Sequence, residues 1–324
     1  MSDYPAHVMP FPPVALNPAL EQVRVPVWEW IEQSGIACGP SARRLLRRAD
    51  PELTCARYFP AASPALLIYL SELTAWAFVN DDQFDDGRLR HDPAAAHRAV
   101  EAQCAALDAT AQPDVPDTPG VMERVLAGLW ARMPADRSRA WHHVLRTDME
   151  ALLWTYATEV TARHENRIPS LKEYLAHRRE AAGTGWCADL VEVVVDVDLP
   201  DKVRQSHAYQ AMKDAAAEHC GLLNDMHSMG KERGTGQIHN AVTLVQHHQD
   251  CSLEEALHQV NDLATACVHR MEQAMQELSA HPAAGLWARG VRDLVRGNYD
   301  WHFESERYRH DQGSSPRAQG DGIR

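Results

Sequence analysis

The stretch LLIYLSELTAWAFVNDDQFDDG (residues 66–87) joins a long apolar run to four aspartates, and it decides the fold class. The run from Leu66 to Val79 is apolar all round, which is typical of a helix buried in a large core. Asp81 and Asp85 are four residues apart, as are Asp82 and Asp86, so each pair shares a helix face. Carboxylates this close repel one another unless a cation joins them. The stretch therefore predicts a buried helix that ends in a cation site, with a solvated helix end as the alternative.

The rest of the chain predicts an all-α protein. Segments in which apolar residues recur roughly every 3.6 positions cover residues 97–110, 119–133, 137–164, 171–195, 203–230, 237–247, 253–279 and 283–308. Alternating strand-like runs are nearly absent, and short turns that contain proline separate the segments. We expect a proline-rich leader over residues 1–16, one helical domain over 17–308 and a flexible tail over 309–324.

The composition excludes several classes of partner. The formal net charge is −13 and no long basic block occurs, which argues against binding to nucleic acid or to an anionic membrane. No uninterrupted apolar run reaches the roughly 18 residues of a membrane span, and the N-terminus has no signal-peptide pattern. The seven cysteines are scattered and never form a C-x-x-C pair, so we expect reduced thiols and a cytoplasmic protein.

A second polar cluster lies in LLNDMHSMGKERG (residues 222–234). Asn224, Ser228 and Glu232 follow one another at intervals of four, so an amide, a hydroxyl and a carboxylate oxygen line one helix face. Hard oxygen ligands of modest charge suit Mg²⁺, which keeps several waters when it binds. Lys231 adds a cation where a substrate anion could bind beside the metal.

The two clusters carry a resemblance to a known family. DDQFD (81–85) and NDMHSMGKE (224–232) resemble the metal-binding motifs of class I terpene synthases of the bacterial type, D-D-x-x-D and N-D-x-x-S-x-x-x-(K)-E. The resemblance extends to NP (17–18), RR (178–179), HN (239–240) and RY (307–308), and so covers residues 17–308.

That resemblance implies a single-domain α-helical bundle with a central active-site cavity. The implied enzyme ionises a linear isoprenoid diphosphate, farnesyl diphosphate first and geranylgeranyl diphosphate second, and cyclises the cation to a hydrocarbon or alcohol with release of diphosphate. It implies three Mg²⁺ ions, with Mn²⁺ as an alternative metal, and a homodimer. The implied metal ligands are Asp81, Asp82, Asp85, Asn224, Ser228 and Glu232.

The resemblance also assigns residues that act on the substrate. The diphosphate would be bound by Arg178, Lys231, Arg307 and Tyr308. Two glycines in EAAGTGW (180–186) favour a helix break, and in the family such a break directs a carbonyl at the developing cation, here near Ala182 and Gly183.

A carbocation must be kept from bulk water, so the cavity should be dry, apolar and partly aromatic. The candidates for its lining are Trp76, Phe78, Phe84, Trp154, Tyr156, Trp186 and Trp301. The alternative for each is an ordinary core position, because aromatic residues on helices more often pack in the core.

Three other functions are alternatives. A trans-prenyltransferase uses the same ionisation to elongate a chain, but it normally carries a second aspartate-rich motif where this chain has Asn224, Ser228 and Glu232. A di-iron carboxylate protein needs E-x-x-H on two helices, and only Glu255 to His258 fits. A non-catalytic helical binding protein leaves no contrary mark in the sequence.

Overall fold

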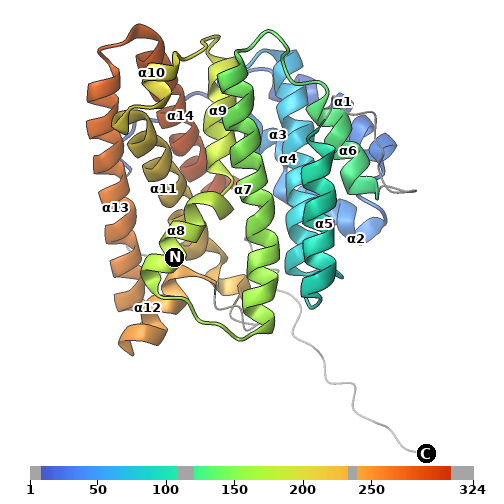
Figure 1. The fold of residues 1–324 in the computed structure, drawn as a ribbon, viewed down its shortest axis with the longest axis vertical. Helices are drawn as coiled ribbons and strands as arrows, with labels where there is room; N and C mark the ends of the chain where they lie inside the picture. Colours follow the sequence, from blue (N-terminus) through green and yellow to red (C-terminus); the bar gives the residue numbers. More distant parts are fainter. Residues whose placement is uncertain (1–8, 109–119, 233–238, 308–324) are drawn as a thin grey trace, which may run out of the picture.

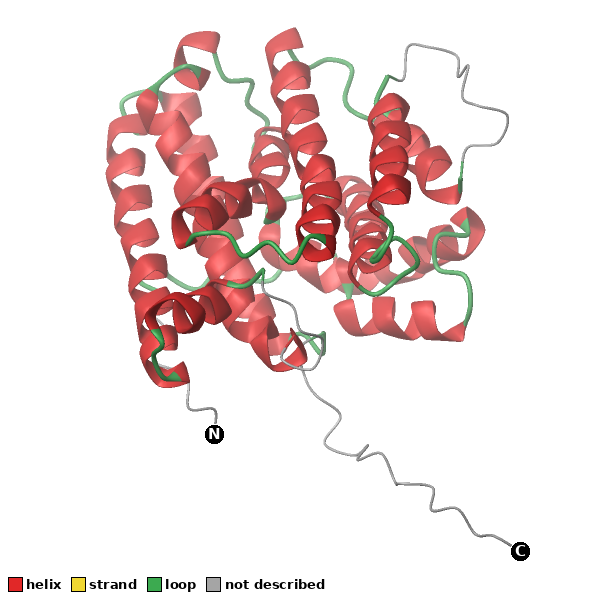
Figure 2. Ribbon diagram, turned by 60° about the horizontal axis from the view of Figure 1, so that its bottom comes forward, coloured by secondary structure: helices red, strands yellow, loops and turns green. Residues whose placement is uncertain are grey.

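The computed structural model describes residues 9–108, 120–232 and 239–307, with the backbone alone for residues 230–232. The described residues form α-helices and no strand, which confirms the all-α prediction (Figure 1 and Figure 2). In chain order the helices are α1 Leu20–Ser34, α2 Pro40–Ala49, α3 Pro51–Tyr58, α4 Pro64–Asp85, α5 Pro93–Ala106, α6 Val121–Trp130, α7 Arg139–His164, α8 Leu171–Ala181, α9 Thr184–Val194, α10 Asp201–Arg204, α11 His207–Glu232, α12 Ala241–Gln249, α13 Leu253–Leu278 and α14 Pro282–Glu304.

The long helices lie side by side along the long axis of the molecule (Figure 1). Helix α11 packs on α13, α14, α8 and α9, while α4 packs on α1, α3, α6 and α7. Helix α7 also contacts α5, α8 and α9, and α14 contacts α3 and α9. The two groups of helices therefore share one continuous core. No described helix has the combination of length and apolar character that crossing a membrane requires.

Helix α4 carries the first aspartate cluster from the core to its rim. Ser63 caps its start by accepting a hydrogen bond from the Leu66 N–H, and Pro64 occupies the first turn, where a missing N–H costs little. The middle of the helix is buried through Leu67, Leu70, Leu73 and Trp76. The aspartates follow in the last turns, where the side chains become partly exposed. The prediction that these acids emerge at the edge of a core is confirmed.

The predicted helix break separates α8 from α9. Gly183 has φ of 67° and ψ of 3°, a left-handed conformation that a side chain would strain. Helix α8 ends at Ala181, and α9 begins at Thr184. The break therefore changes the chain direction at the position that the glycines indicated.

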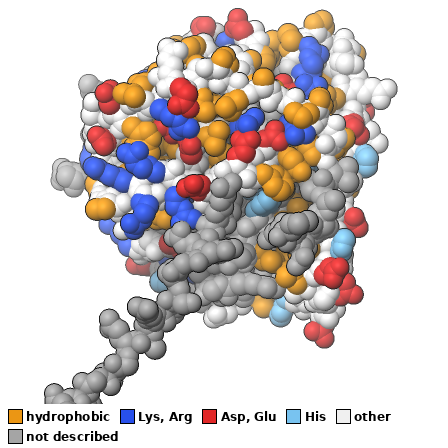
Figure 3. Space-filling model, turned by 180° about the vertical axis from the view of Figure 1, so that it is seen from behind, with side chains coloured by type: hydrophobic (Ala, Val, Ile, Leu, Met, Phe, Trp, Pro, Cys, Tyr) orange, Lys and Arg blue, Asp and Glu red, His pale blue; other side chains and the backbone are white. Residues whose placement is uncertain are grey.

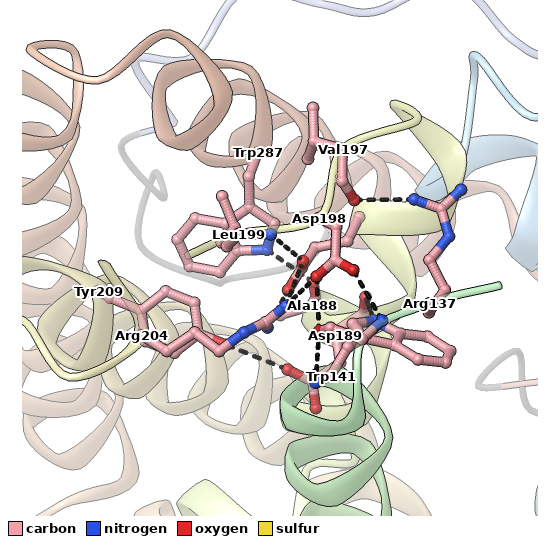
Figure 4. A network of polar contacts seen from close by, with 12 residues as sticks. Arg137, Trp141, Ala188, Asp189, Val197, Asp198, Leu199, Arg204, Tyr209 and Trp287 are labelled. Atoms are coloured by element: carbon pink, nitrogen blue, oxygen red, sulfur yellow. Dashed lines mark hydrogen bonds and ion pairs between the residues drawn. The ribbon is translucent and has the colours of Figure 1, made fainter. Parts of the chain in front are cut away.

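A buried polar network holds α9 in place (Figure 4). The indole N–H groups of Trp141 on α7 and Trp287 on α14 donate to the carbonyls of Asp189 and Ala188, at 2.9 and 2.8 Å. Farther along the chain, the Arg204 guanidinium forms two hydrogen bonds with the Glu192 carboxylate, and Glu192 is fully buried. These hydrogen bonds from α7, α14 and α10 fix the helix from three sides.

The N-terminal segment is more closely packed than the predicted leader. Phe11 is only 5% exposed and belongs to the core, and its carbonyl accepts a hydrogen bond of 2.8 Å from Arg296. Asn17 donates to the carbonyls of Phe59 and Ala62 at 3.1 and 2.8 Å. The packed unit thus includes residues ahead of the predicted boundary at residue 17, because an aromatic side chain there completes the core. The predicted tail, 309–324, lies outside the described residues.

The surface charges and the cysteines can be compared with what the composition predicted. On the described part of the face shown in Figure 3, acidic and basic side chains lie among apolar ones, with several basic side chains grouped at the left. All seven cysteines are free thiols, as the scattered spacing predicted.

Candidate active site

A cavity of about 180 Å³ lies among α3, α4, α7, α8, α9, α11 and α14. Its lining includes Asp81 of the first motif and Asn224 of the second. Arg178 and Arg307, the two described residues predicted to bind diphosphate, line it as well. The structure therefore brings both motifs and both arginines to one cavity.

Arginines hold the carboxylates of the first motif. The Arg307 Nη2 donates to Asp81 Oδ2 at 3.2 Å and to Asp82 Oδ1 at 3.4 Å. The Arg163 guanidinium lies 3.5 Å from Asp85 Oδ1. Burial at the cavity and the neighbouring carboxylates raise the pKa of Asp81 to about 8, although Arg307 lowers it. Burial of Asp81 and repulsion from the neighbouring acids together thus outweigh the effect of Arg307, and additional positive charge would be stabilised here.

The second motif is organised in the same way. The Arg178 Nη2 donates to Asn224 Oδ1 at 2.8 Å, and its Nε donates to Asp225 Oδ1 at 3.1 Å. Asn240 lies close, and its amide donates to Ser228 Oγ at 3.5 Å. The amide and hydroxyl oxygens of Asn224 and Ser228 are therefore oriented by hydrogen bonds.

Asp225 positions Arg178, a role that the sequence did not reveal. It is 2% exposed, and its Oδ2 accepts hydrogen bonds from the Tyr174 hydroxyl at 2.6 Å and from the Ala241 N–H at 3.0 Å. Burial raises the pKa of Asp225, while Arg178 and the other donors oppose that increase. Asp225 thus fixes the guanidinium that faces the cavity. In the sequence, only its position next to Asn224 in the second motif pointed to such a role.

Three predicted residues fall outside the described side chains. These are Lys231 and Glu232 at the end of α11, and Tyr308 after α14. Their assigned roles in binding metal and diphosphate stay predictions.

The donor set fits a hard divalent cation. Carboxylates of Asp81, Asp82 and Asp85 and neutral oxygens of Asn224 and Ser228 are ligands that Mg²⁺ accepts, and no soft ligand is among them. Within the described part of the chain, no three His, Cys, Asp or Glu side chains already converge on one point. Metal binding would therefore require these side chains to move until their oxygens converge, and Arg307, Arg163 and Arg178 now contact several of them.

The aromatic candidates divide into two groups. Phe78, Tyr156, Trp186 and Trp301 line the cavity. The ring of Phe78 stacks on that of Trp301 with centroids 6.0 Å apart, and the Arg307 guanidinium lies 4.7 Å from the Phe78 centroid. Phe84 stacks on Tyr156 behind the lining, with centroids 5.0 Å apart.

Two aromatic assignments are corrected by the structure. Trp76 is 1% exposed, and its indole N–H donates to the Met122 carbonyl at 2.9 Å, so it belongs to the core toward α6. Trp154 is 38% exposed and packs edge-on against His97. Neither lines the cavity. Each lies two residues before a residue that does, Phe78 or Tyr156, and two residues turn a helix by about 200°, which places them on the other side.

Further polar groups near the cavity were not predicted. The Glu159 Oε1 lies 2.8 Å from Nε2 of His177, and His177 directly precedes Arg178 in the chain. Although burial raises the pKa of Glu159, His177 and the charges of His239 and Arg178 bring it down to about 2. His302 lines the cavity, and its Nδ1–H donates to a backbone carbonyl at 2.8 Å. Burial lowers the pKa of His302 to about 3, so its ring is neutral.

Comparison with known proteins identifies the family. The family model "Terpene synthase family 2, C-terminal metal binding" matches residues 72–270, which include both motifs. The chain is 32% identical to (2Z,6E)-hedycaryol synthase of Kitasatospora setae, over 98% of this chain and 96% of that protein. It is 31% identical to (−)-beta-caryophyllene synthase of Saccharothrix espanaensis, over 93% and 87%.

Solved structures agree with these sequence relatives. The ligand-free structure of hedycaryol synthase superposes with a TM-score of 0.81 at 31% identity, and the likeness covers 93% of this chain and 100% of that one. Because the family model spans more than half of the chain and the fold agrees throughout, the chain belongs to terpene synthase family 2 and is a class I terpene synthase.

Proposed function

We propose that the chain binds Mg²⁺ and farnesyl diphosphate, ionises the substrate and cyclises the cation to a terpene hydrocarbon or alcohol, with release of diphosphate. The observation that carries the proposal is that Asp81, Asn224, Arg178 and Arg307 line one cavity whose walls are partly aromatic. A C15 substrate is supported by the relative from Saccharothrix espanaensis, whose name states that it cyclises (2E,6E)-farnesyl diphosphate. Geranylgeranyl diphosphate is the second choice.

Three Mg²⁺ ions are proposed, with Mn²⁺ as an alternative. The ligands from the described residues would be Asp81, Asp82, Asp85, Asn224 and Ser228, with Glu232 added from the motif. When bound, such ions neutralise the charge that develops on the departing diphosphate as the allylic C–O bond breaks.

The arginines supply directional donors to the same anion. Arg178 and Arg307 now donate to carboxylate and amide oxygens at 2.8 to 3.4 Å. Phosphate oxygens can accept hydrogen bonds from the same planar guanidinium N–H groups, and a diphosphate carries more negative charge than a carboxylate or an amide. A diphosphate would therefore compete for both guanidinium groups. Arg307 also lies over the ring of Phe78, which holds it at the cavity by a cation–π contact.

The helix break would act on the carbocation and not on the diphosphate. Ala182 and Gly183 line the cavity together with Ala181, and none of these side chains is polar. Positive charge that develops on the substrate carbon chain would be stabilised there by backbone carbonyl dipoles. We therefore assign cation stabilisation at this wall to the backbone near Ala182 and Gly183.

The cavity must widen when substrate binds. Its volume of about 180 Å³ is below the roughly 300–1,000 Å³ of ligand pockets. If Arg307 leaves Asp81 and Asp82 for a phosphate group, the space at the mouth increases. The same movement frees the carboxylate oxygens for metal.

The test is incubation with Mg²⁺ and a single allylic diphosphate, farnesyl or geranylgeranyl, with and without isopentenyl diphosphate. Gas chromatography with mass spectrometry should show a cyclic terpene from the single substrate, and chelation of the metal should abolish it. Chain elongation without any terpene from the single substrate would contradict the proposal in favour of a prenyltransferase. Binding of diphosphate without turnover of any allylic diphosphate would contradict it in favour of a binding protein.

A further inference from the structure

A second pocket lies on the flank of the bundle, apart from the active-site cavity. It has a volume of about 590 Å³ and lies among α7, α8, α9 and α11. Exposed residues such as His143, Thr147 and Gln210 form part of its lining, so it is open to solvent. Charged side chains are part of its lining, among them Lys213, which forms an ion pair of 2.5 Å with Asp148. We expect water to fill this pocket.

Trp186 stands between the flank pocket and the active-site cavity. Among the described residues it is the one that lines both. On either side of it, neighbours in sequence face different spaces: Leu152 lines the cavity and Ala151 the flank pocket, while Gly183 lines the cavity and Gly185 the flank pocket. At this point the two linings share the Trp186 side chain.

The hydrogen bonding of Trp186 differs from that of the structural tryptophans. The indole N–H groups of Trp76, Trp141 and Trp287 each donate to a backbone carbonyl at 2.8 to 2.9 Å. Trp186 is 5% exposed, yet its N–H finds no acceptor among the described residues. That nitrogen lies 3.1 Å from the point where a side chain on Gly183 would begin. The indole is therefore placed against the helix break by packing and not by a hydrogen bond.

The backbone that carries Trp186 is fixed. The carbonyls of Ala188 and Asp189, in the next turn of α9, accept the hydrogen bonds from α14 and α7 shown in Figure 4. A rigid helix and a missing glycine side chain together leave a slot that the indole fills. No other described residue belongs to both linings.

We propose that the Trp186 side chain is the wall that keeps flank water out of the active-site cavity until cyclisation is complete. The inference rests on the proposed function, because the cavity must then contain a carbocation. Water that entered early would form a C–O bond to the cationic carbon and lose a proton, giving an alcohol with fewer rings. One water needs only about 10–15 Å³, far less than the space an indole occupies. Truncation of Trp186 would therefore join the two spaces.

The first experiment measures access to the cavity in the full-length protein without substrate. Cys220 lines the cavity and is 3% exposed. In Trp186→Ala, methyl methanethiosulfonate should modify Cys220 faster by about tenfold or more, because the truncation adds a route to this buried thiol from the flank pocket. Trp154→Ala, which truncates a tryptophan that lines neither pocket, is the matched control and should leave the rate unchanged. Modification of Cys55, which is fully buried, should stay slow in all variants and so excludes unfolding.

The second experiment measures the products formed in H₂¹⁸O from farnesyl diphosphate and Mg²⁺. Trp186→Ala should increase the fraction of ¹⁸O-labelled alcohols with fewer rings than the wild-type product, and Trp186→Phe, which keeps an aromatic ring, should increase it less. If the alanine variant does not fold, the phenylalanine variant carries both measurements.

The outcomes separate the two proposals. The proposal for Trp186 would be overturned if the wild type is active and the Trp186 variants show neither faster modification of Cys220 nor more ¹⁸O in the products. Faster modification with a wild type that converts no allylic diphosphate would contradict the proposed function and still support the wall.

Discussion

Glu52 offers a direct test of how the core beneath the cavity is stabilised. It lies in the first turn of α3 and is fully buried, and neither carboxylate oxygen has a hydrogen-bond partner among the described residues. Burial, with a further contribution from Asp50, raises the pKa of Glu52 to about 7, although its own backbone N–H and Arg24 oppose the increase. Helix α3 packs on α14, which carries Trp301 and His302 of the cavity.

The size of the effect follows from the two pKa values. In the unfolded chain a glutamate ionises near 4.5, whereas here it ionises near 7. Because the raised value belongs to the folded state, the neutral form is the one that folding favours, and stability is lost as pH rises from about 4.5 through about 7. With about 1.4 kcal/mol for each pKa unit, the loss reaches about 3 kcal/mol at pH 8 and about 1 kcal/mol at pH 5. Glu52→Gln cannot ionise, so it should be more stable than wild type by these amounts.

The assay is urea unfolding of wild type and Glu52→Gln at pH 5 and pH 8. The free energy of unfolding of the variant should exceed that of wild type at both pH values, with the larger gain at pH 8. Glu29→Gln, an exposed glutamate on α1, is the matched control and should change stability by less than about 0.5 kcal/mol at either pH. A gain that is independent of pH, or a variant less stable than wild type at pH 8, would refute the reasoning.

Four further outcomes are expected. Asp82→Ala and Asn224→Ala should abolish turnover without loss of helical circular dichroism, whereas Asp86→Ala, in the same cluster but half exposed, should retain activity; unfolding of the first two would tell against a role at the rim. Glu192→Ala leaves the buried Arg204 without its main partner and should cost about 3–5 kcal/mol in urea unfolding, so a loss below about 1 kcal/mol would show that the network is dispensable. Tyr174→Phe should cost about 1 kcal/mol and lower turnover, because Asp225 holds Arg178 less firmly; unchanged kinetics would remove Asp225 from that role. Inorganic diphosphate and Mg²⁺ together should raise the melting temperature by more than the sum of their separate effects, and Arg307→Ala should reduce that excess while Arg146→Ala, on the far part of α7, should not; an equal excess in both variants would count against Arg307.

Helix periodicity located the charged part of the site because the relevant spacings are local. Asp81 and Asn224 were found from intervals of four residues together with the family motifs, and they line one cavity in the structure. The same geometry could have sorted the aromatic candidates. Positions three and four before Asp81 are Phe78 and Ala77, which line the cavity, whereas Trp76 is five before it and faces away.

Contacts between distant segments could not be read in the same way. Arg163 reaches Asp85 because α7 packs against α4, and no pattern around either residue records that pairing. Phe11 enters the core from a segment whose prolines indicate a surface leader. The proposed wall at Trp186 depends on two pockets that form only after the helices have packed. In each case the contact depends on how distant segments pack, which local sequence patterns do not show.

The arginines at both motifs explain how the folded protein tolerates clustered acidic side chains before metal binds. Three carboxylates at the end of α4 face two guanidinium groups, so the cluster is partly neutralised and the pKa of Asp81 still rises. A diphosphate that attracts Arg307 would remove this compensation just where metal ions could replace it. Conversely, metal at the carboxylates would release Arg307 for the phosphate oxygens. Each ligand therefore favours the other, since linkage between two sites is reciprocal. We therefore expect a site built in this way to bind metal and diphosphate together and to keep its acids paired in their absence.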